Sequence, residues 1–150
     1  MITHWDEVEA HRRERGHIAG SWQALTGYNS ITVGVQRISV EAGRWATPLH
    51  LEGSEEEIFY VLAGTGFSFQ VEGDDERVFP VGPGDCLVHR ALEHAHTIGA
   101  GDDELVVLAF GQRQIDAIRF AFPKHTGRRR RVGGSGERRE HPFLPCPFSG

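Results

Sequence analysis

Two groups of histidine and carboxylate side chains are the part of this sequence best suited to chemistry. His50 and Glu52 stand two residues apart, Glu57 follows shortly after, and His94 and His96 are again two apart. Side chains two apart on a β-strand project from the same face, so each pair can point into one site. Imidazole nitrogens and carboxylate oxygens together suit a divalent metal ion.

The stretch 43–66 has to position the first of these groups. A proline stiffens the entry to a strand that carries His50 and Glu52, and a Gly-Ser turn follows. The β-branched and aromatic run 58–62 is typical of a buried strand, and the sequence Gly-Thr-Gly then reverses the chain. The sequence therefore predicts a hairpin whose facing strands bring an imidazole and carboxylates together.

These residues resemble the two motifs of the cupin superfamily. The first motif has a His-x-His pair, then a Glu and a Gly seven after it, which His50, Glu57 and Gly64 match. Glu52 departs from the motif because it stands where the second His usually is. The second motif has a Gly-Asp turn, a strand and a His, which 84–88 and His96 match without the usual Pro. The resemblance covers roughly residues 31–111.

The resemblance implies a metal centre of His50, Glu52, Glu57 and His96, holding Fe, Mn, Zn or Ni. His94 is the rival to His96, which is preferred because the residues after it match those that follow the ligand His in cupins. The resemblance does not choose among the metals.

Other interpretations stand beside these ligands. Glu52 can complete a set of two His and a carboxylate, or it can be an acid on a solvent-facing rim. If Glu57 points inward among apolar neighbours, it needs a cation or a donor as its partner. Glu55 and Glu56 are interpreted as a solvated edge that repels strand addition, and His89 as a structural residue.

The composition limits the class of protein. The chain has 150 residues, the size of one domain, with 39% hydrophobic and 25% charged residues, and its 19 Gly and 7 Pro favour an all-β body with many turns. No apolar run is long enough for a membrane span, and the acidic start lacks a secretory signal, so we expect a cytoplasmic protein. Cys86 and Cys146 do not make a disulfide framework.

Charge divides the chain into a body and a tail. Residues 1–123 carry 9 Lys and Arg against 19 Asp and Glu, whereas residues 124–150 carry 7 against 2. We expect a single cupin domain over 1–123 and a basic tail rich in Gly, Arg and Pro over 124–150. The tail contains four consecutive Arg, at 128–131, without an aromatic or strand platform, so a nucleic-acid partner is not expected.

The remaining elements complete the predicted fold. Residues 3–15 are predicted as a short helix, 17–30 as a loop, and 115–122 as a final strand. Strands are predicted over 31–41, 67–72, 77–81, 86–89, 95–98 and 105–110. About nine closely spaced strands predict an all-β jelly roll or small barrel with an N-terminal helix. The resemblance implies the cupin-type double-stranded β-helix, which is a jelly-roll barrel.

Two functions from different classes are open at this point. The first is a metal-binding cupin enzyme that acts on a small molecule as an oxygenase, isomerase or decarboxylase. The second is a non-catalytic cupin that binds a small molecule or sugar, with a metal site weakened by Glu52. The resemblance also implies a homodimer, with segments 105–110 and 118–122 as candidates for the contact.

Overall fold

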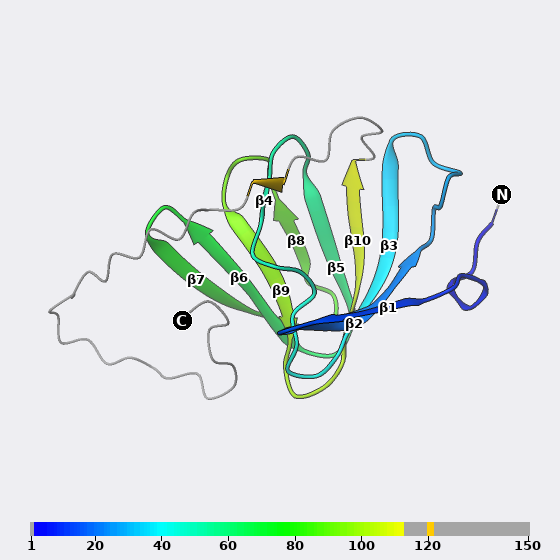
Figure 1. Cartoon of the computed structure of the whole chain (residues 1–150), viewed down its shortest axis with the longest axis horizontal. Coiled ribbons are helices and arrows are strands. Elements are labelled where there is room, and N and C mark those ends of the chain that lie inside the picture. Colours follow the sequence, from blue (N-terminus) through cyan, green and yellow to red (C-terminus); the bar gives the residue numbers. More distant parts are fainter. Residues whose placement is uncertain (1, 113–119, 122–150) are drawn as a thin grey trace, which may run out of the picture.

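The computed structural model describes residues 2–112 and 120–121, which form an all-β structure (Figure 1). A six-stranded sheet has the order β1-β2-β3-β10-β5-β8, a three-stranded sheet has the order β7-β6-β9, and β11 pairs with β4. All of these strand pairs are antiparallel, and the predicted all-β class is confirmed. The strands are β1 (His11–Arg15), β2 (Ile18–Ala24), β3 (Val33–Val40), β4 (Leu51–Glu52), β5 (Glu57–Ala63), β6 (Gly66–Glu72), β7 (Asp75–Val81), β8 (Cys86–His89), β9 (Ala95–Ala100), β10 (Leu105–Gln112) and β11 (Phe120–Ala121).

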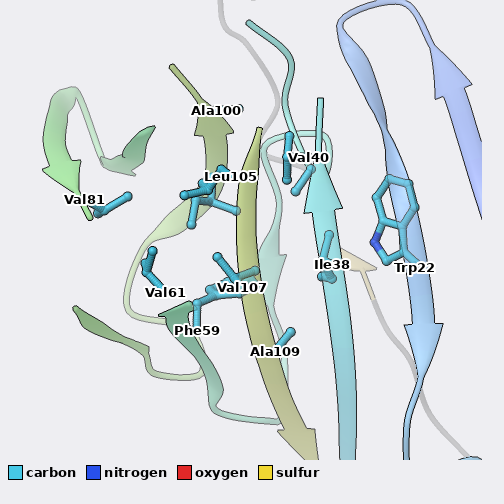
Figure 2. Packing of buried hydrophobic residues seen from close by; sticks show 12 residues of the cluster. Trp22, Ile38, Val40, Phe59, Val61, Val81, Ala100, Leu105, Val107 and Ala109 are labelled. Carbon is cyan, nitrogen blue, oxygen red and sulfur yellow. The ribbon is translucent and has the colours of Figure 1, made fainter. Parts of the chain in front are cut away.

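The main hydrophobic core lies between the two larger sheets (Figure 2). Strand β10 is central in its sheet, between β3 and β5, and it buries Leu105, Val106, Val107 and Ala109. The three-stranded sheet adds Ile98 and Ala100 from β9 and Val81 from β7. The other members of this core are Trp22, Ile38, Val40, Ala46, Phe59, Val61, Leu105, Val107 and Ala109.

The alternation along β5 aims Glu57 into the molecule. Phe59 and Val61 are 2% and 0% exposed, and Glu57 lies two residues before Phe59 on the same face. Gly64 ends this hairpin strand with a φ of +76°, and a Cβ there would collide with the Glu104 carbonyl. The glycine of the predicted motif therefore permits both the turn and a close approach of two backbones.

The segment between β3 and β4 ties the two sheets together at Trp45. Trp45 forms isolated bridges with Ile18 in the first sheet and with Gly99 in the second. A Cβ on Gly99 would lie 2.8 Å from the Trp45 ring, so this packing requires glycine at that position. The same segment then leads to His50, which bridges to His96 on β9.

The predicted N-terminal helix is wrong. Only Trp5–Glu7 form a turn of 3-10 helix, and His11–Arg15 form the edge strand β1. The segment 18–24, predicted as part of a loop, is β2 and pairs with both β1 and β3. Ion pairs between β1 and the segment after β3, Arg12 with Glu41 and Glu14 with Arg44, accompany this pairing. The helix-favouring composition was overridden by a tight hairpin turn at Gly16 and by sheet contacts.

The other predicted strands differ from the observed ones by at most two residues at each end. The predicted strand 115–122 is described only at Phe120–Ala121, and the rest of it lies outside the described residues, as does the tail 124–150. The division at 123 therefore stays a prediction. Among the described residues, no helix has the length and hydropathy needed to cross a membrane.

Candidate metal centre

A backbone bridge brings His50 and His96 side by side. The His50 amide donates to the His96 carbonyl at 3.2 Å, and the His96 amide donates to the His50 carbonyl at 2.8 Å. Residues that exchange both bonds lie directly opposite one another in an antiparallel pair, with their side chains on the same face. The two ring centroids are accordingly 4.7 Å apart.

Glu57 reaches the same point from the start of β5, in the other sheet. Its Oε2 lies 2.9 Å from His96 Nε2 and 3.6 Å from His50 Nε2. His50, Glu57 and His96 each offer one ligand atom within 4.8 Å of the other two. The fold thus brings together three of the four predicted ligands, from segments that are far apart in the sequence.

Glu52 approaches this group through His50. Its Oε1 lies 3.3 Å from His50 Nε2, and the residue is only 7% exposed. The interpretation of Glu52 as an acid on a solvent-facing rim is therefore wrong. It shares a buried face with His50, as the spacing of two residues predicts, while standing beside the group of three.

The Pro48 carbonyl determines which nitrogen of His50 carries a proton. His50 Nδ1 lies 2.9 Å from this oxygen, and a carbonyl can only accept, so Nδ1 donates. The Nε2 atom then faces the carboxylates of Glu52 and Glu57. A lone pair directed at two carboxylates needs a proton or a metal ion between them, and this backbone contact is the kind that orients metal-binding histidines.

Burial and neighbouring charges shift the pKa values of this group in opposite directions. Burial raises the pKa of Glu57, but the hydrogen bonds and charges of His50 and His96 outweigh it and hold this pKa at about 2. Burial and the Glu57 charge raise the pKa of Glu52. Burial lowers the pKa of His50, but Glu57, the Pro48 carbonyl and Glu52 together raise it. A cation bound among these groups would stabilise the charged carboxylates of Glu52 and Glu57.

The spacing of the donor atoms fits a transition-metal ion. Two ligand atoms about 2.1 Å from one ion are about 3.0 Å apart at a right angle and about 3.4 Å apart at the tetrahedral angle. The donor atoms are 2.9 Å apart for His96 and Glu57, 3.6 Å for His50 and Glu57, and 3.3 Å for His50 and Glu52, which lies outside the group of three. Mixed nitrogen and oxygen donors at these distances are compatible with Fe, Mn, Zn or Ni.

The rival ligand His94 lies with a different group. Its Nε2 is 2.8 Å from His89 Nδ1, and His89, His94 and His96 form a second set of three possible ligands within 4.8 Å. His89 is 1% exposed and stacks on His96, with ring centroids 3.8 Å apart and planes 4° apart. Its β-strand register opposite Glu57 is what directs it here, and strand periodicity alone could have suggested this inward position.

A cavity of about 520 Å³ opens beside the carboxylates of the metal group. Its lining includes His50, Glu52 and Glu57 together with Trp22 and Glu55. Glu55 was interpreted as part of a solvated edge, and this is wrong: it is half-buried, and its Oε2 is a buried atom without a hydrogen-bond partner among the described residues. Only its neighbour Glu56 is exposed as predicted.

Another hollow, of about 440 Å³, lies among the turns at Thr65, Gly82 and Gly101. Its lining contains none of the predicted ligands. The cavity beside His50 is therefore the one relevant to the chemistry of the metal group.

Comparison with solved structures finds many proteins of similar fold. A candidate sugar phosphate isomerase from Acidithiobacillus ferrooxidans is 27% identical, with a TM-score of 0.63, and the match covers 73% of this chain and 70% of that one. The polyketide cyclase RemF from Streptomyces resistomycificus is 23% identical, with a TM-score of 0.63, covering 83% and 87%. Bacillus subtilis oxalate decarboxylase, a protein with Mn(II) centres, is 21% identical, with a TM-score of 0.57, covering 74% and 29%.

A search of curated proteins finds no significant match. The model of the Cupin domain family, however, matches residues 36–111, which is just over half of the chain. This range contains all four predicted ligands and the strands that carry them, and it agrees with the extent of the resemblance seen in the sequence. The chain belongs to the cupin family.

Proposed function

We propose that this protein is a metal-dependent cupin that acts on a small molecule bound in the cavity beside the ion. The observation that carries the proposal is the convergence of His50, Glu57 and His96 next to that cavity. A site with protein ligands on one side and open space on the other leaves coordination positions for a substrate.

The roles of the residues follow from their atoms. His50 and His96 would bind the ion through Nε2, and Glu57 would bind through Oε2 and neutralise part of its charge. Glu52 would be the fourth ligand, 3.3 Å from His50. When bound, the ion supplies a Lewis acid that polarises a substrate oxygen, or a redox centre. The buried Trp22 forms an apolar wall of the cavity and limits the access of water.

Similarity to the named structures supports a small-molecule activity but leaves the reaction open. Those proteins are named for sugar phosphate isomerisation, polyketide cyclisation and oxalate decarboxylation, at identities of 27% or less. The oxygenase, isomerase and decarboxylase types are to be separated by turnover assays with substrates of each class.

Metal analysis tests the proposal directly. Protein purified without chelator is expected to contain about one Fe, Mn, Zn or Ni per chain, or to take one up when these ions are added. His50→Ala should lower this occupancy, and the exposed His17→Ala serves as the matched control. Unchanged occupancy in His50→Ala would remove this residue from the site.

The second candidate is a non-catalytic cupin that binds a small molecule or sugar. It is favoured by Glu52, which replaces an imidazole expected from the motif and stands outside the group of three. A metal content below about 0.2 per chain, with no uptake of added ions, would support this candidate. Ligands from the three substrate classes should then raise the unfolding temperature without being converted.

Two further expectations belong to this proposal. The protein is expected to be cytoplasmic and a homodimer. Since β10 is a central strand, a contact through it would use the outer face of the six-stranded sheet, where neighbouring Tyr60 and Val88 are 40% and 47% exposed. Light scattering coupled to size exclusion measures the oligomeric state.

A further inference from the structure

Three histidines meet next to the carboxylate group, and His96 belongs to both groups. His89 ends β8, His94 lies in the following turn, and His96 belongs to β9. One ring nitrogen of each lies within 4.8 Å of the other two. His89 and His96 are each 1% exposed, and His94 is half-buried, so this imidazole cluster begins in the interior and ends near the surface.

His96 has one nitrogen in each environment. Its Nε2 is 2.9 Å from Glu57 Oε2, within the carboxylate group. Its Nδ1 is buried and has no hydrogen-bond partner in the described part of the chain. A buried polar nitrogen without a partner costs free energy, which a cation or a donor would recover.

We propose that His89, His94 and His96 form a second metal site, adjacent to the carboxylate group and selective for Zn²⁺, Cu²⁺, Ni²⁺ or Co²⁺. His96 contributes Nδ1 to it, while its Nε2 belongs to the first site. A neutral imidazole carries one proton, so when both sites are filled His96 releases that proton to solvent and bridges the two ions as an imidazolate. Three imidazoles without a carboxylate suit these ions, whereas Mn²⁺ and Mg²⁺ prefer oxygen ligands. The inference concerns metal binding alone and does not depend on the reaction proposed above.

The distances show what binding requires. His89 Nδ1 and His94 Nε2 are 2.8 Å apart, close to the separation of about 2.9 Å for neighbouring ligands at a right angle around one ion. An ion would replace their hydrogen bond with two metal–nitrogen bonds. The lone pairs of the parallel His89 and His96 rings do not converge, so one of these rings must turn out of the stack when the ion enters.

The proposal is tested by measuring how many Zn²⁺ ions the full chain binds. The protein carries no affinity tag, and its metal is removed beforehand. Equilibrium dialysis should give two Zn²⁺ per chain for the wild type, and one each for His94→Gln and Glu57→Gln. For His94→Gln, we expect the Kd of the lost equivalent to rise by more than about a hundredfold, since even partners that only orient metal ligands are worth about 10–100-fold. The exposed His17→Gln is the matched control for adventitious binding and should retain two.

The electron paramagnetic resonance of Cu²⁺ bound to Glu57→Gln provides a second readout. Hyperfine splitting from three nitrogens is expected, and splitting from two or fewer would contradict the three-imidazole site. Two Zn²⁺ per folded chain in His94→Gln would overturn the inference and make the cluster a packing feature. That outcome is distinguishable from failure of the carboxylate site, which would appear as two Zn²⁺ in Glu57→Gln.

Discussion

The two sides of His96 make opposite electrostatic environments from similar side chains. On one side, His50 lies 3.3 Å from Glu52 and 3.6 Å from Glu57. On the other side, His89 contacts the imidazoles of His94 and His96, and the charge of Glu57, its cross-strand partner, acts on it less strongly than they do. Carboxylates stabilise a nearby positive charge, and neighbouring imidazoles oppose it.

The effect on the two buried histidines is opposite in sign. Burial lowers the pKa of His50, but the carboxylates and the Pro48 carbonyl reverse this and raise it. Burial, reinforced by His96 and His94, lowers the pKa of His89 to about 3. Burial alone therefore does not determine how a histidine titrates, and the carboxylate side is the one that favours a protonated imidazole.

Replacing the shared residue should have the largest effect. His96→Ala removes a ligand from both sides, so we expect metal affinity to fall by more than about a hundredfold at each site. Isothermal titration with Zn²⁺ and Mn²⁺ measures both losses. His94→Gln is the control, because it should leave Mn²⁺ binding at the carboxylate side unchanged. If His96→Ala retained Mn²⁺ binding, His96 would not be a ligand on the carboxylate side, and the two sides would not share this ring.

The second-largest expected difference between the two sides is in how the folding stability depends on acid pH. In metal-free protein, His89 stays neutral in the fold down to about pH 3 but takes up a proton below about pH 6.5 when unfolded. Its contribution to stability is therefore lost as the pH falls from about 6.5 towards 3, by about 1.4 kcal/mol per pH unit. His50 has the opposite sign: its contribution is present below about pH 6.5 and is lost as the pH rises through its raised pKa.

Urea unfolding from pH 8 to 4 measures this dependence. His89→Gln should flatten the loss of stability towards acid pH, whereas His50→Gln should change the profile only above about pH 6.5, where it removes the loss of stability with rising pH. The slopes are compared rather than the absolute stabilities, because both substitutions also disturb packing. The same slope in His89→Gln and wild type would show that His89 titrates alike in the folded and unfolded chains.

The sequence predicted the carboxylate side much better than the imidazole side. His50, Glu57 and His96 follow a spacing that strand periodicity and a known motif both interpret. The strands that carry Glu57 and His96 were predicted within two residues at each end. His89 was interpreted as structural because it stands where cupins often have a Pro-rich turn, and nothing local connects it to His96. Their stacking depends on the pairing of β5 with β8 and of β6 with β9, which spacing along the chain does not reveal.

The predictions for the N-terminal segment and for Glu55 were wrong for related reasons. Residues 3–15 favour a helix locally, yet contacts with later segments hold 11–15 as a strand: Glu41, for example, pairs with Arg12. Glu55 belongs to an acidic run that is typical of a solvated edge, but it lines the cavity close to Gly111 of β10. In both cases partners distant in sequence decided the outcome.

Restoring the imidazole of the motif at position 52 should change metal binding less than the substitutions above. Glu52→His makes the carboxylate side more like the other side, with three imidazoles and Glu57. We expect metal occupancy to be kept or raised and the preference to move from Mn²⁺ towards Zn²⁺, by about tenfold or less. Competition dialysis with both ions measures the ratio. A strong loss of all binding in a folded variant would show that the Glu52 carboxylate is required.

Glu55→Gln should have the smallest effect and should touch only the cavity. Burial and the charges of Glu52 and Glu57 raise the pKa of Glu55 against a backbone hydrogen bond from Gln112. Its Oε2 is buried without a partner among the described residues, so this oxygen can accept a hydrogen bond from a ligand once the side chain turns towards the cavity. An amide of the same shape keeps the packing but has one acceptor oxygen fewer. We expect unchanged Mn²⁺ and Zn²⁺ stoichiometry and a fewfold weaker binding of a hydroxylated ligand, a loss of about 1 kcal/mol. The exposed Glu56→Gln is the matched control, since its side chain points elsewhere. A loss of metal in Glu55→Gln would instead place this carboxylate among the ligands and make the carboxylate side richer in oxygen than the spacing of the motif implies.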